Sequence, residues 1–160
     1  MAKRSGKRKA APGDVATNRQ ASFRYELLDR FECGIELQGS EVKSMREGGV
    51  QLKDAYAALE GGEVWLHRMY VAPYRPAARE NHEPERPRKL LLHRREIERL
   101  IGQTAEKGLT LVPTRVYFRG PLAKVELALA RGKAAVDRRR DIRDREQRRE
   151  IERALSERSR

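Results

Sequence analysis

The sequence predicts a mainly β protein, a small closed antiparallel barrel with short interposed helices and a basic C-terminal tail. At least six short segments alternate apolar and polar residues or form brief apolar runs, while two segments suggest helices. Gly-Gly and Gly-Pro steps separate several of these segments, as in tight turns. Antiparallel strands must protect their edges, and only about 110 of the 160 residues lie outside the charged ends, so we expect one small closed barrel.

The first expected β segment covers residues 23–37, either as one long strand or as two strands joined by a bend at Gly34. Its odd positions are mostly apolar and its even positions mostly polar, which is the period of a strand with one buried face. Gly39 ends this strand, and we expect Ser40 to cap a short helix through Met45 that the Gly48-Gly49 pair stops.

The next two expected strands, residues 56–59 and 64–69, form a hairpin. Gly61-Gly62 between them suits a tight turn, because both positions of such a turn need a positive φ. Residues 71–87 contain four prolines, which exclude regular structure over most of this segment. We therefore expect a long surface loop there, and such loops are often functional.

The remaining elements are a short strand, a helix and three further strands. Residues 90–92 form the short strand, and residues 94–107 form the helix, which Gly108 ends. The apolar stripe of this helix consists of Ile97, Leu100, Ile101 and Thr104. The last strands are residues 109–112, residues 115–118 and, after a turn at Gly120-Pro121, a strand in which Val125, Leu127 and Leu129 point into the core.

The positive charge is concentrated at the two ends of the chain, which has 36 Lys and Arg against 24 Asp and Glu and a net charge of +12. Residues 1–20 carry six basic residues and one acidic residue, and residues 131–160 carry twelve and seven, so each end contributes +5. Clustered cations indicate a polyanionic partner, and nucleic acid is favoured because neutralising phosphates releases counterions. A solvated tail and a membrane-surface anchor are the alternatives. The anchor is disfavoured because residues 138–160 contain only three large apolar side chains, Ile142, Ile151 and Leu155.

The sequence carries no strong signal of a metal or cofactor. His67, His82 and His93 lie in different expected elements, and none has metal-ligand spacing with another His or Cys. Cys33 is the single cysteine, which excludes an intrachain disulfide, and we expect it to be a small core residue. No membrane-length apolar run or signal-peptide pattern is present, so we expect a cytoplasmic protein without contact to a membrane.

Catalysis is also a weak interpretation. Ser40, Ser44, Lys43 and Glu41 lie close in sequence and could suggest a Ser-Lys hydrolase. However, Glu41 and Lys43 on a short helix are more often a surface pair, and no other motif supports hydrolysis. We therefore expect a protein that is not an enzyme.

The same region fits a nucleic-acid surface better. Small barrels bind nucleic acid on one face through basic and polar side chains. Ordinary solvated surface would explain these positions equally well if they stood alone. The candidate RNA-binding residues are Asn18, Arg19, Lys43, Arg46, Arg88 and Lys89, with Arg86 beside them.

Four sequence blocks identify a family resemblance. They are Gly39-Ser-Glu-Val-Lys-Ser-Met-Arg46 with Gly48, Arg88-Lys-Leu-Leu-Leu-His93, Lys107-Gly-Leu-Thr-Leu-Val-Pro113, and Gly132-Lys133 with Asp137-Arg138-Arg139. In this order and spacing, from Asn18 to about Arg149, they closely resemble the small protein B family, the SsrA-binding proteins.

The resemblance implies a barrel related to the oligonucleotide-binding fold and a role in ribosome rescue. Family members bind the tRNA-like domain of transfer-messenger RNA and enter stalled ribosomes with elongation factor Tu, and we expect a monomer. The family's RNA-facing positions fall here on Asn18, Arg19, Glu41, Lys43 and Lys89. Glu41 is unusual on such a surface, and either orientation of Lys43, hydrogen bonds to RNA or a structural role would account for it.

The resemblance also implies that the tail enters the decoding centre and the empty mRNA channel of the small subunit. Gly132 would be the hinge and residues 140–155 the channel helix. The expected ribosome-facing residues are Gly132, Lys133, Asp137, Arg138, Arg139, Arg143 and Arg145. The i,i+4 pairs Asp141–Arg145 and Asp144–Arg148 are too weak to hold an isolated helix, so we expect a tail that is disordered when free and helical when bound.

The chain therefore divides into a disordered basic arm at residues 1–16, a barrel at 17–131 and a basic tail at 132–160. It departs from the family pattern at Ala134, where a second lysine is usual, and at Arg138, where lysine is usual. Val136 replaces a larger side chain able to stack. The alternative function is a general RNA-binding or structural ribosome-associated protein without a decoding role.

Overall fold

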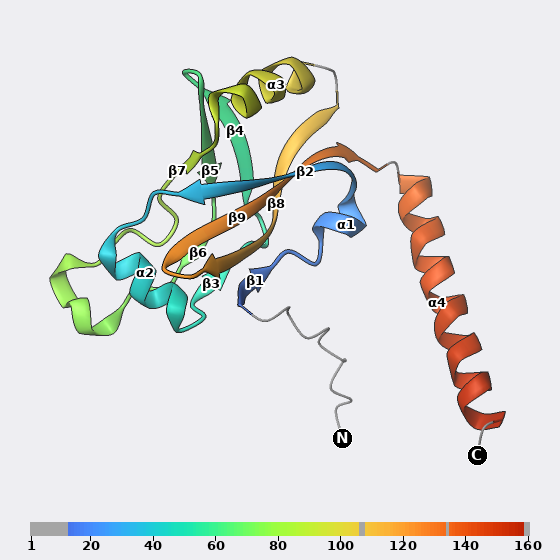
Figure 1. Cartoon of the computed structure of the whole chain (residues 1–160). Helices are drawn as coiled ribbons and strands as arrows, with labels where there is room; N and C mark the ends of the chain where they lie inside the picture. Colours follow the sequence, from blue (N-terminus) through green and yellow to red (C-terminus); the bar gives the residue numbers. More distant parts are fainter. Residues whose placement is uncertain (1–12, 106–107, 134, 159–160) are drawn as a thin grey trace.

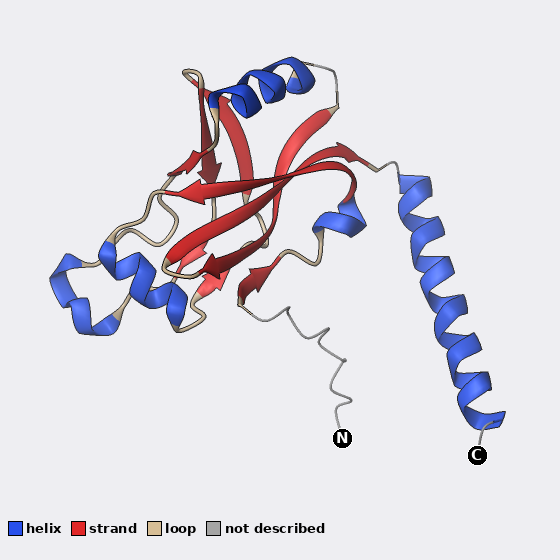
Figure 2. Cartoon of the chain, in the orientation of Figure 1, coloured by secondary structure: helices blue, strands red, loops and turns tan. Residues whose placement is uncertain are grey.

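A computed structural model describes residues 13–105, 108–133 and 135–158, with the side chains of residues 78 and 135–138 left out. The described chain is mainly β, with antiparallel strands and short helices (Figures 1 and 2). The strands are β1 (Asp14–Thr17), β2 (Tyr25–Ile35), β3 (Val50–Gln51), β4 (Tyr56–Glu60), β5 (Glu63–His67), β6 (Tyr70–Val71), β7 (Arg88–Leu91), β8 (Leu109–Arg119) and β9 (Leu122–Gly132). The helices are α1 (Ala21–Arg24), α2 (Gly39–Arg46), the 3-10 helix η1 (Arg75–Glu80), α3 (Arg94–Thr104) and α4 (Ala135–Arg158).

Seven strands pair in the order β1-β8-β4-β5-β7-β2-β9. β8 also pairs with β9, so the pairings that begin at β8 return to β8, with β1 attached beside them. β3 and β6 form a separate two-stranded sheet. The connection between β4 and β5 is the expected hairpin, and Gly61 and Gly62 both have positive φ, at 60° and 77°. This prediction is confirmed.

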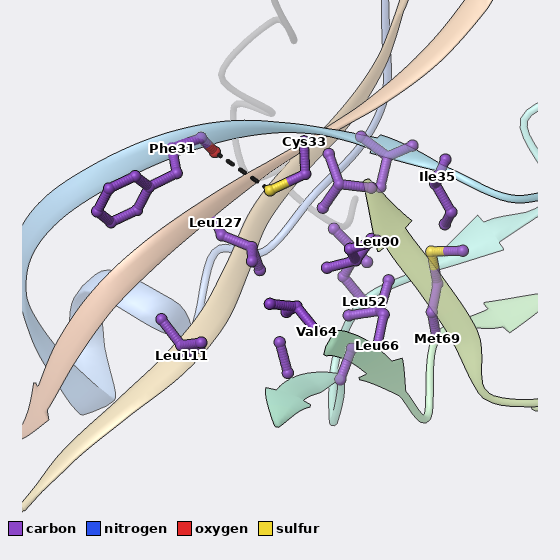
Figure 3. Close-up of a cluster of buried hydrophobic side chains, with 14 of the residues drawn as sticks. Phe31, Cys33, Ile35, Leu52, Val64, Leu66, Met69, Leu90, Leu111 and Leu127 are labelled. Atoms are coloured by element: carbon purple, nitrogen blue, oxygen red, sulfur yellow. Dashed lines mark hydrogen bonds between the residues drawn. The ribbon is translucent and has the colours of Figure 1, made fainter. Parts of the chain in front are cut away.

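One apolar cluster fills the space enclosed by these strands, and strands far apart in the sequence contribute to it (Figure 3). Cys33 is completely buried among Phe31, Leu127 and Val64, as expected for a small core residue. On β9, Val125 and Leu127 have no exposed surface and Leu129 is 3% exposed, which confirms the expected phase of this strand.

The other side of β9 is covered as well, next to α1. Ala21 of α1 packs with Val112 of β8 and Ala130 of β9 in a second small cluster. Small side chains at these positions allow the one-turn helix to lie close to the strands. α1 therefore includes Phe23 and Arg24, which the sequence assigned to the start of a strand. That assignment followed from the alternation of Phe23, Tyr25 and Leu27.

Two further expectations are wrong in detail. Residues 109–112 and 115–118 are parts of one strand, β8, which continues through Pro113 with an irregularity in register between Pro113 and Arg115. The register shift leaves Thr114 without a register partner on β9, as at a β-bulge, next to a proline that cannot donate to the ladder. The N-cap of α2 is Gln38 rather than Ser40, because the Glu41 carboxylate accepts the Gln38 backbone N–H at 2.9 Å.

The tail is a single helix, α4, of 24 residues. It leaves the end of β9 and runs away from the sheet, passing near α1 (Figure 1). The sequence predicts a tail that is disordered in the free protein, whereas the structure contains a helix, because residues 135–158 contain no Gly or Pro and are rich in Arg and Glu. Its largest apolar side chains remain exposed, so little packing supports the helix.

Candidate nucleic-acid interface

The α2 helix is fixed by a buried ionic cluster beneath it. Glu41 is completely buried and accepts hydrogen bonds from the guanidinium groups of both Arg86 and Arg88. Burial alone would raise the pKa of Glu41, but the hydrogen bonds from the Gln38 backbone, Arg86 and Arg88 outweigh it, and the pKa lies below its ordinary value. Glu41 is therefore a buried carboxylate that holds two arginines.

Arg88 uses its remaining donors inside the protein. It has no exposed surface and donates to the carbonyl oxygens of Met69 at 2.7 Å and Pro84 at 3.1 Å. Burial lowers the pKa of Arg88, and the hydrogen bond and charge of Glu41 oppose that effect. Neither Glu41 nor Arg88, both expected to face RNA, lies on the surface in this structure. They join α2, the segment before β7 and β7 itself.

A second set of hydrogen bonds ties α2 to the loop that follows β6. His82, 6% exposed, lies 2.9 Å from the Ser40 hydroxyl through Nδ1 and 2.9 Å from the Val71 carbonyl through Nε2. The carbonyl can only accept, so we assign the proton to Nε2, and Nδ1 accepts from Ser40. The Ser44 hydroxyl donates to the Ala72 carbonyl. These contacts turn one face of α2 inward and leave the opposite face to solvent.

The solvent face of α2 presents two cations over aromatic rings. The Lys43 ammonium lies 5.7 Å from the ring centroid of Tyr74, and the Arg46 guanidinium lies 4.5 Å from that of Phe118. Both cations are exposed and stand three residues apart on the helix, so they point to the same side. The rings limit the rotamers of these side chains and present the two charges together.

Lys89 and the residues before α1 take different positions. Lys89 is half-buried and forms an ion pair with Glu63 at 2.8 Å, which raises its pKa. The Asn18 side chain donates to the Pro113 carbonyl at 3.0 Å, and its backbone N–H donates to Thr114 at 2.7 Å. Asn18 thus holds the β1–α1 connection against β8 and leaves Arg19 exposed.

The expected residues therefore lie on separate elements of the fold. Lys43 and Arg46 lie on α2, with Lys89 on the strand that follows the buried cluster. Arg19 lies in the connection between β1 and α1, which is a different element from α2. The structure does not gather all of them on one continuous patch.

The tail residues lie on or just before α4. Gly132 is the last residue of β9 and pairs with Tyr25. It has no positive φ, and an added Cβ would meet no atom within 4 Å, so the local backbone does not require glycine there. Arg139, Arg143 and Arg145 are exposed, and Lys133 is partly buried. The backbones of Asp137 and Arg138 belong to α4, but their side chains lie outside the described part of the structure.

The structure also contains a charge network on the outer side of β2, β8 and β9 that the sequence did not predict. Glu126, 8% exposed, accepts from Arg30 at 3.0 Å and from Arg115, which also donates to Asp14 at 3.1 Å. Burial opposes ionisation of Glu126, but the two arginines outweigh it and lower its pKa. The sequence shows opposite charges on the expected strands, which is the only signal of this network. It does not show the register between the strands, which decides whether those charges meet.

A neighbouring pair extends this network. The Tyr117 hydroxyl donates to Glu32, and burial together with that carboxylate raises the pKa of Tyr117 to about 12.

Among the described residues, no group of three or more His, Cys, Asp or Glu side chains could hold a metal ion. No helix in the same residues is both long and apolar enough to cross a membrane.

Comparisons with known proteins match this chain to a single family. A family model described as SmpB protein matches residues 15–157. The SsrA-binding protein of Carboxydothermus hydrogenoformans is 54% identical over 141 residues, which are 88% of this chain and 95% of that protein. The SsrA-binding protein of Mycolicibacterium paratuberculosis is 47% identical over 165 aligned residues, covering 99% of this chain and 98% of that protein.

A solved structure is also similar. It is described as "tmRNA-SmpB: a journey to the center of the bacterial ribosome", and one of its chains is 49% identical with a TM-score of 0.64. The similarity covers 75% of this chain and 85% of that chain. The sequence is therefore shared with these relatives over most of their length, and the fold is shared with most of the chain in the solved structure.

Proposed function

The chain belongs to the SmpB family, and from this membership we propose that it binds transfer-messenger RNA and serves ribosome rescue by trans-translation. In this role it binds the tRNA-like domain and accompanies it, with elongation factor Tu, into the A site of a stalled ribosome. The observation that carries the proposal is 47% identity across 99% of the chain to a protein named for SsrA binding, because that match includes the tail as well as the sheet.

We propose that the solvent face of α2 is one RNA contact. Lys43 and Arg46 are exposed, lie on one side of the helix and are held over aromatic rings. Fixed cations lose less conformational entropy when they meet phosphates than mobile ones. Glu41 and Arg88 act from below as positioning residues, since their charges are used within the protein.

Lys89, Asn18 and Arg19 complete the proposed contact set. Lys89 would leave its ion pair with Glu63 and bind an RNA phosphate instead. The ion pair between Lys89 and Glu63 is half-exposed and therefore weak enough to permit this change of partner. Arg19 would contact RNA directly, and Asn18 would hold the connection that carries it.

We further infer that the sheet is a closed barrel of the oligonucleotide-binding type. The return of the strand pairings to β8 and the single apolar cluster inside the ring support this inference. Family membership supports it as well. Residues 14–16, expected to belong to a disordered arm, form part of β1 and pair with β8, so the expected boundary at residue 17 is wrong. We place the barrel at residues 14–131 and the tail at 132–160, and the rest of the expected arm, residues 1–12, lies outside the described residues.

The tail is proposed to act at the decoding centre and in the empty mRNA channel. Gly132 would be the hinge, and the absence of any local need for glycine there supports a role in motion or in close approach of a partner. Lys133, Asp137, Arg138, Arg139, Arg143 and Arg145 would meet ribosomal RNA. At roughly 1.5 Å per residue, the 24 residues of α4 span about 36 Å, which suits a channel.

The protein is proposed to act as a monomer in the cytoplasm, without catalysis and without a cofactor. The rival function is a general RNA-binding or structural ribosome-associated protein without a decoding role. It would share the basic tail and the cations of α2, so affinity for RNA alone does not separate the two functions.

The decisive measurement is binding of the full chain to transfer-messenger RNA, followed by fluorescence anisotropy, with elongator tRNA as competitor. We expect transfer-messenger RNA to be retained against a tenfold excess of tRNA. Equal competition by tRNA and by an unrelated RNA of the same length would favour the general RNA-binding protein.

A further inference from the structure

The β6–β7 loop, residues 72–87, is closed on itself by hydrogen bonds on both sides of η1. The Tyr74 backbone N–H donates to the Asn81 side-chain carbonyl at 2.8 Å, and the Asn81 side-chain amide donates to the Tyr74 carbonyl at 2.9 Å. At the base of the loop, His82 lies 2.9 Å from the Val71 carbonyl oxygen. These bonds join the outgoing and returning branches of the loop, so η1 has a defined position between them.

The closed loop is also attached to α2. Each contact joins one residue of α2 to one residue of the loop, and the four residues of α2 that take part lie within about one and a half turns of the helix. The pairs are Ser40–His82, Glu41–Arg86, Lys43–Tyr74 and Ser44–Ala72. The loop therefore lies beside α2 and forms one surface with it (Figure 1).

Tyr74 stands where this surface meets the exposed face of α2. Its ring is half-buried, and the Lys43 ammonium lies 5.7 Å from the ring centroid. Asn81 bonds both backbone polar groups of Tyr74, which holds the ring at this place. A cation is attracted to an aromatic face, so the ring in turn limits the positions that the Lys43 ammonium occupies.

Two further cations follow Tyr74 on η1. Arg75 and Arg79 are exposed, and neither forms an ion pair with any residue that the structure describes. An arginine without a carboxylate partner is available for bidentate hydrogen bonds to a phosphate. Glu80 is exposed on the same short helix, so the loop carries both signs of charge, and its two arginines can be tested against this carboxylate.

We propose that the β6–β7 loop is a second wall of the RNA contact on α2, at which Arg75 and Arg79 bind phosphates. Tyr74 positions Lys43 for the same RNA, and Asn81 is the positioning residue that keeps the loop closed. This inference rests on the proposed RNA contact of α2 and adds a separate segment of the chain to it. Cations that are held in place before binding lose less conformational entropy when they meet phosphates.

The test is the salt dependence of binding between the full chain and transfer-messenger RNA, followed by fluorescence anisotropy. Arg75→Ala with Arg79→Ala should reduce the magnitude of the slope of log K against log salt by about two, because two phosphate contacts are lost. Lys53→Ala with Arg68→Ala is the matched control, since it removes two exposed cations outside α2 and the loop, and it should leave the slope unchanged. Glu80→Gln should strengthen binding by about twofold, because a carboxylate beside phosphates repels them.

Asn81→Ala tests the closure of the loop without a change of charge. Alone, it should weaken binding by about fivefold, since an open loop loses more conformational entropy when it binds. In a background that already lacks Lys43, Arg75 and Arg79, the same substitution should have no effect, because the cations that it positions are gone. A general loss of stability would weaken binding equally in both backgrounds.

The proposal is wrong if the arginine double variant keeps the slope of the unmodified protein, if the control lowers the slope equally, or if Glu80→Gln fails to strengthen binding. Equal losses from Asn81→Ala in the two backgrounds would overturn its positioning role. If the unmodified protein does not select transfer-messenger RNA over tRNA, the proposed function fails and this inference fails with it. If the unmodified protein does select that RNA and the double variant keeps its slope, only the role of the loop is overturned.

Discussion

Glu41 and Arg88 face each other inside the protein with neither side chain exposed to solvent. They are separated by 47 residues in sequence, and their ion pair joins α2 to β7. Removal of one member would leave the other charge buried without its partner, which is far more costly than the loss of a surface pair.

Glu41→Ala should therefore lower the free energy of unfolding by about 3–5 kcal/mol. Urea denaturation followed by Trp65 fluorescence measures this change. The matched control is Glu47→Ala, an exposed glutamate at the end of the same helix, which should change stability by no more than about 0.5 kcal/mol. Similar losses for both variants would show that the buried pair has no special role. The double variant Glu41→Leu with Arg88→Met should recover part of the loss, because neither buried charge remains.

Stability should also fall in acid, through Glu41 and Glu126. The folded-state pKa of each lies below the ordinary value of 4.5, because hydrogen bonds from arginine and other donors outweigh burial. The unfolded state therefore takes up protons first as the pH falls, so the contribution of each carboxylate is present above its unfolded pKa and is lost as the pH falls through the folded pKa. Thermal unfolding midpoints measured from neutral pH downward should decline in acid. The decline should be shallower in Glu41→Gln, and an equally steep decline would contradict the assignment.

Leu127→Ala should destabilise the protein by about 2–5 kcal/mol, because Leu127 is completely buried in the cluster of Figure 3. Leu122→Ala on the same strand is the control, since Leu122 is 59% exposed. That substitution should stay within about 0.5 kcal/mol. Denaturant unfolding gives the loss of stability for each variant. A larger loss for Leu122→Ala than for Leu127→Ala would show that the buried and exposed faces of β9 have been exchanged.

Binding to the tRNA-like domain should be strongly salt-dependent. If roughly four to eight phosphates are neutralised, log K should fall against log salt with a slope of about −3 to −6. The double substitution Lys43→Ala with Arg46→Ala should reduce the magnitude of that slope by about two, because two phosphate contacts are lost. Lys53→Ala removes an exposed cation that is not part of α2 and should leave the slope unchanged. An unchanged slope in the double variant would remove α2 from the RNA contact.

The tail should separate RNA binding from rescue. Replacement of Asp137, Arg138 and Arg139 together by Ala should leave affinity for transfer-messenger RNA nearly unchanged and sharply reduce peptide tagging on stalled ribosomes. The control replaces Arg148, Arg149 and Glu150, which carry the same charges further along α4, and should reduce tagging less. Full tagging by the first variant would favour the general RNA-binding protein over the decoding role.

Local patterns made part of this fold predictable. The alternation of Val125, Leu127 and Leu129 predicted a strand with the correct buried face, and Gly61-Gly62 predicted the hairpin because only residues tolerant of positive φ suit that turn. The start of the first strand could not be predicted, because α1 forms where Ala21 packs on Val112 and Ala130. Packing between distant residues overrode a local period.

The candidate site was predictable in its cations but not in their roles. Lys43 and Arg88 look alike in sequence, yet one is exposed and the other buried, because β7 turns Arg88 inward toward Glu41. That distinction depends on how α2 lies over the strands. The hydrogen bond from the Lys133 ammonium to the Ser22 carbonyl was equally hidden, since the two residues are 111 residues apart.

The single cysteine gives this protein an internal reporter. Cys33 is completely buried, and burial raises its pKa to about 12, so almost no reactive thiolate exists at neutral pH while the core is closed. A thiol reagent can reach it only when the strands around it separate. Fraying of α4 or movement of the loops leaves it protected. The rate of thiol modification under native conditions would therefore measure how often the whole core opens, a quantity set by global unfolding rather than by motion of the tail.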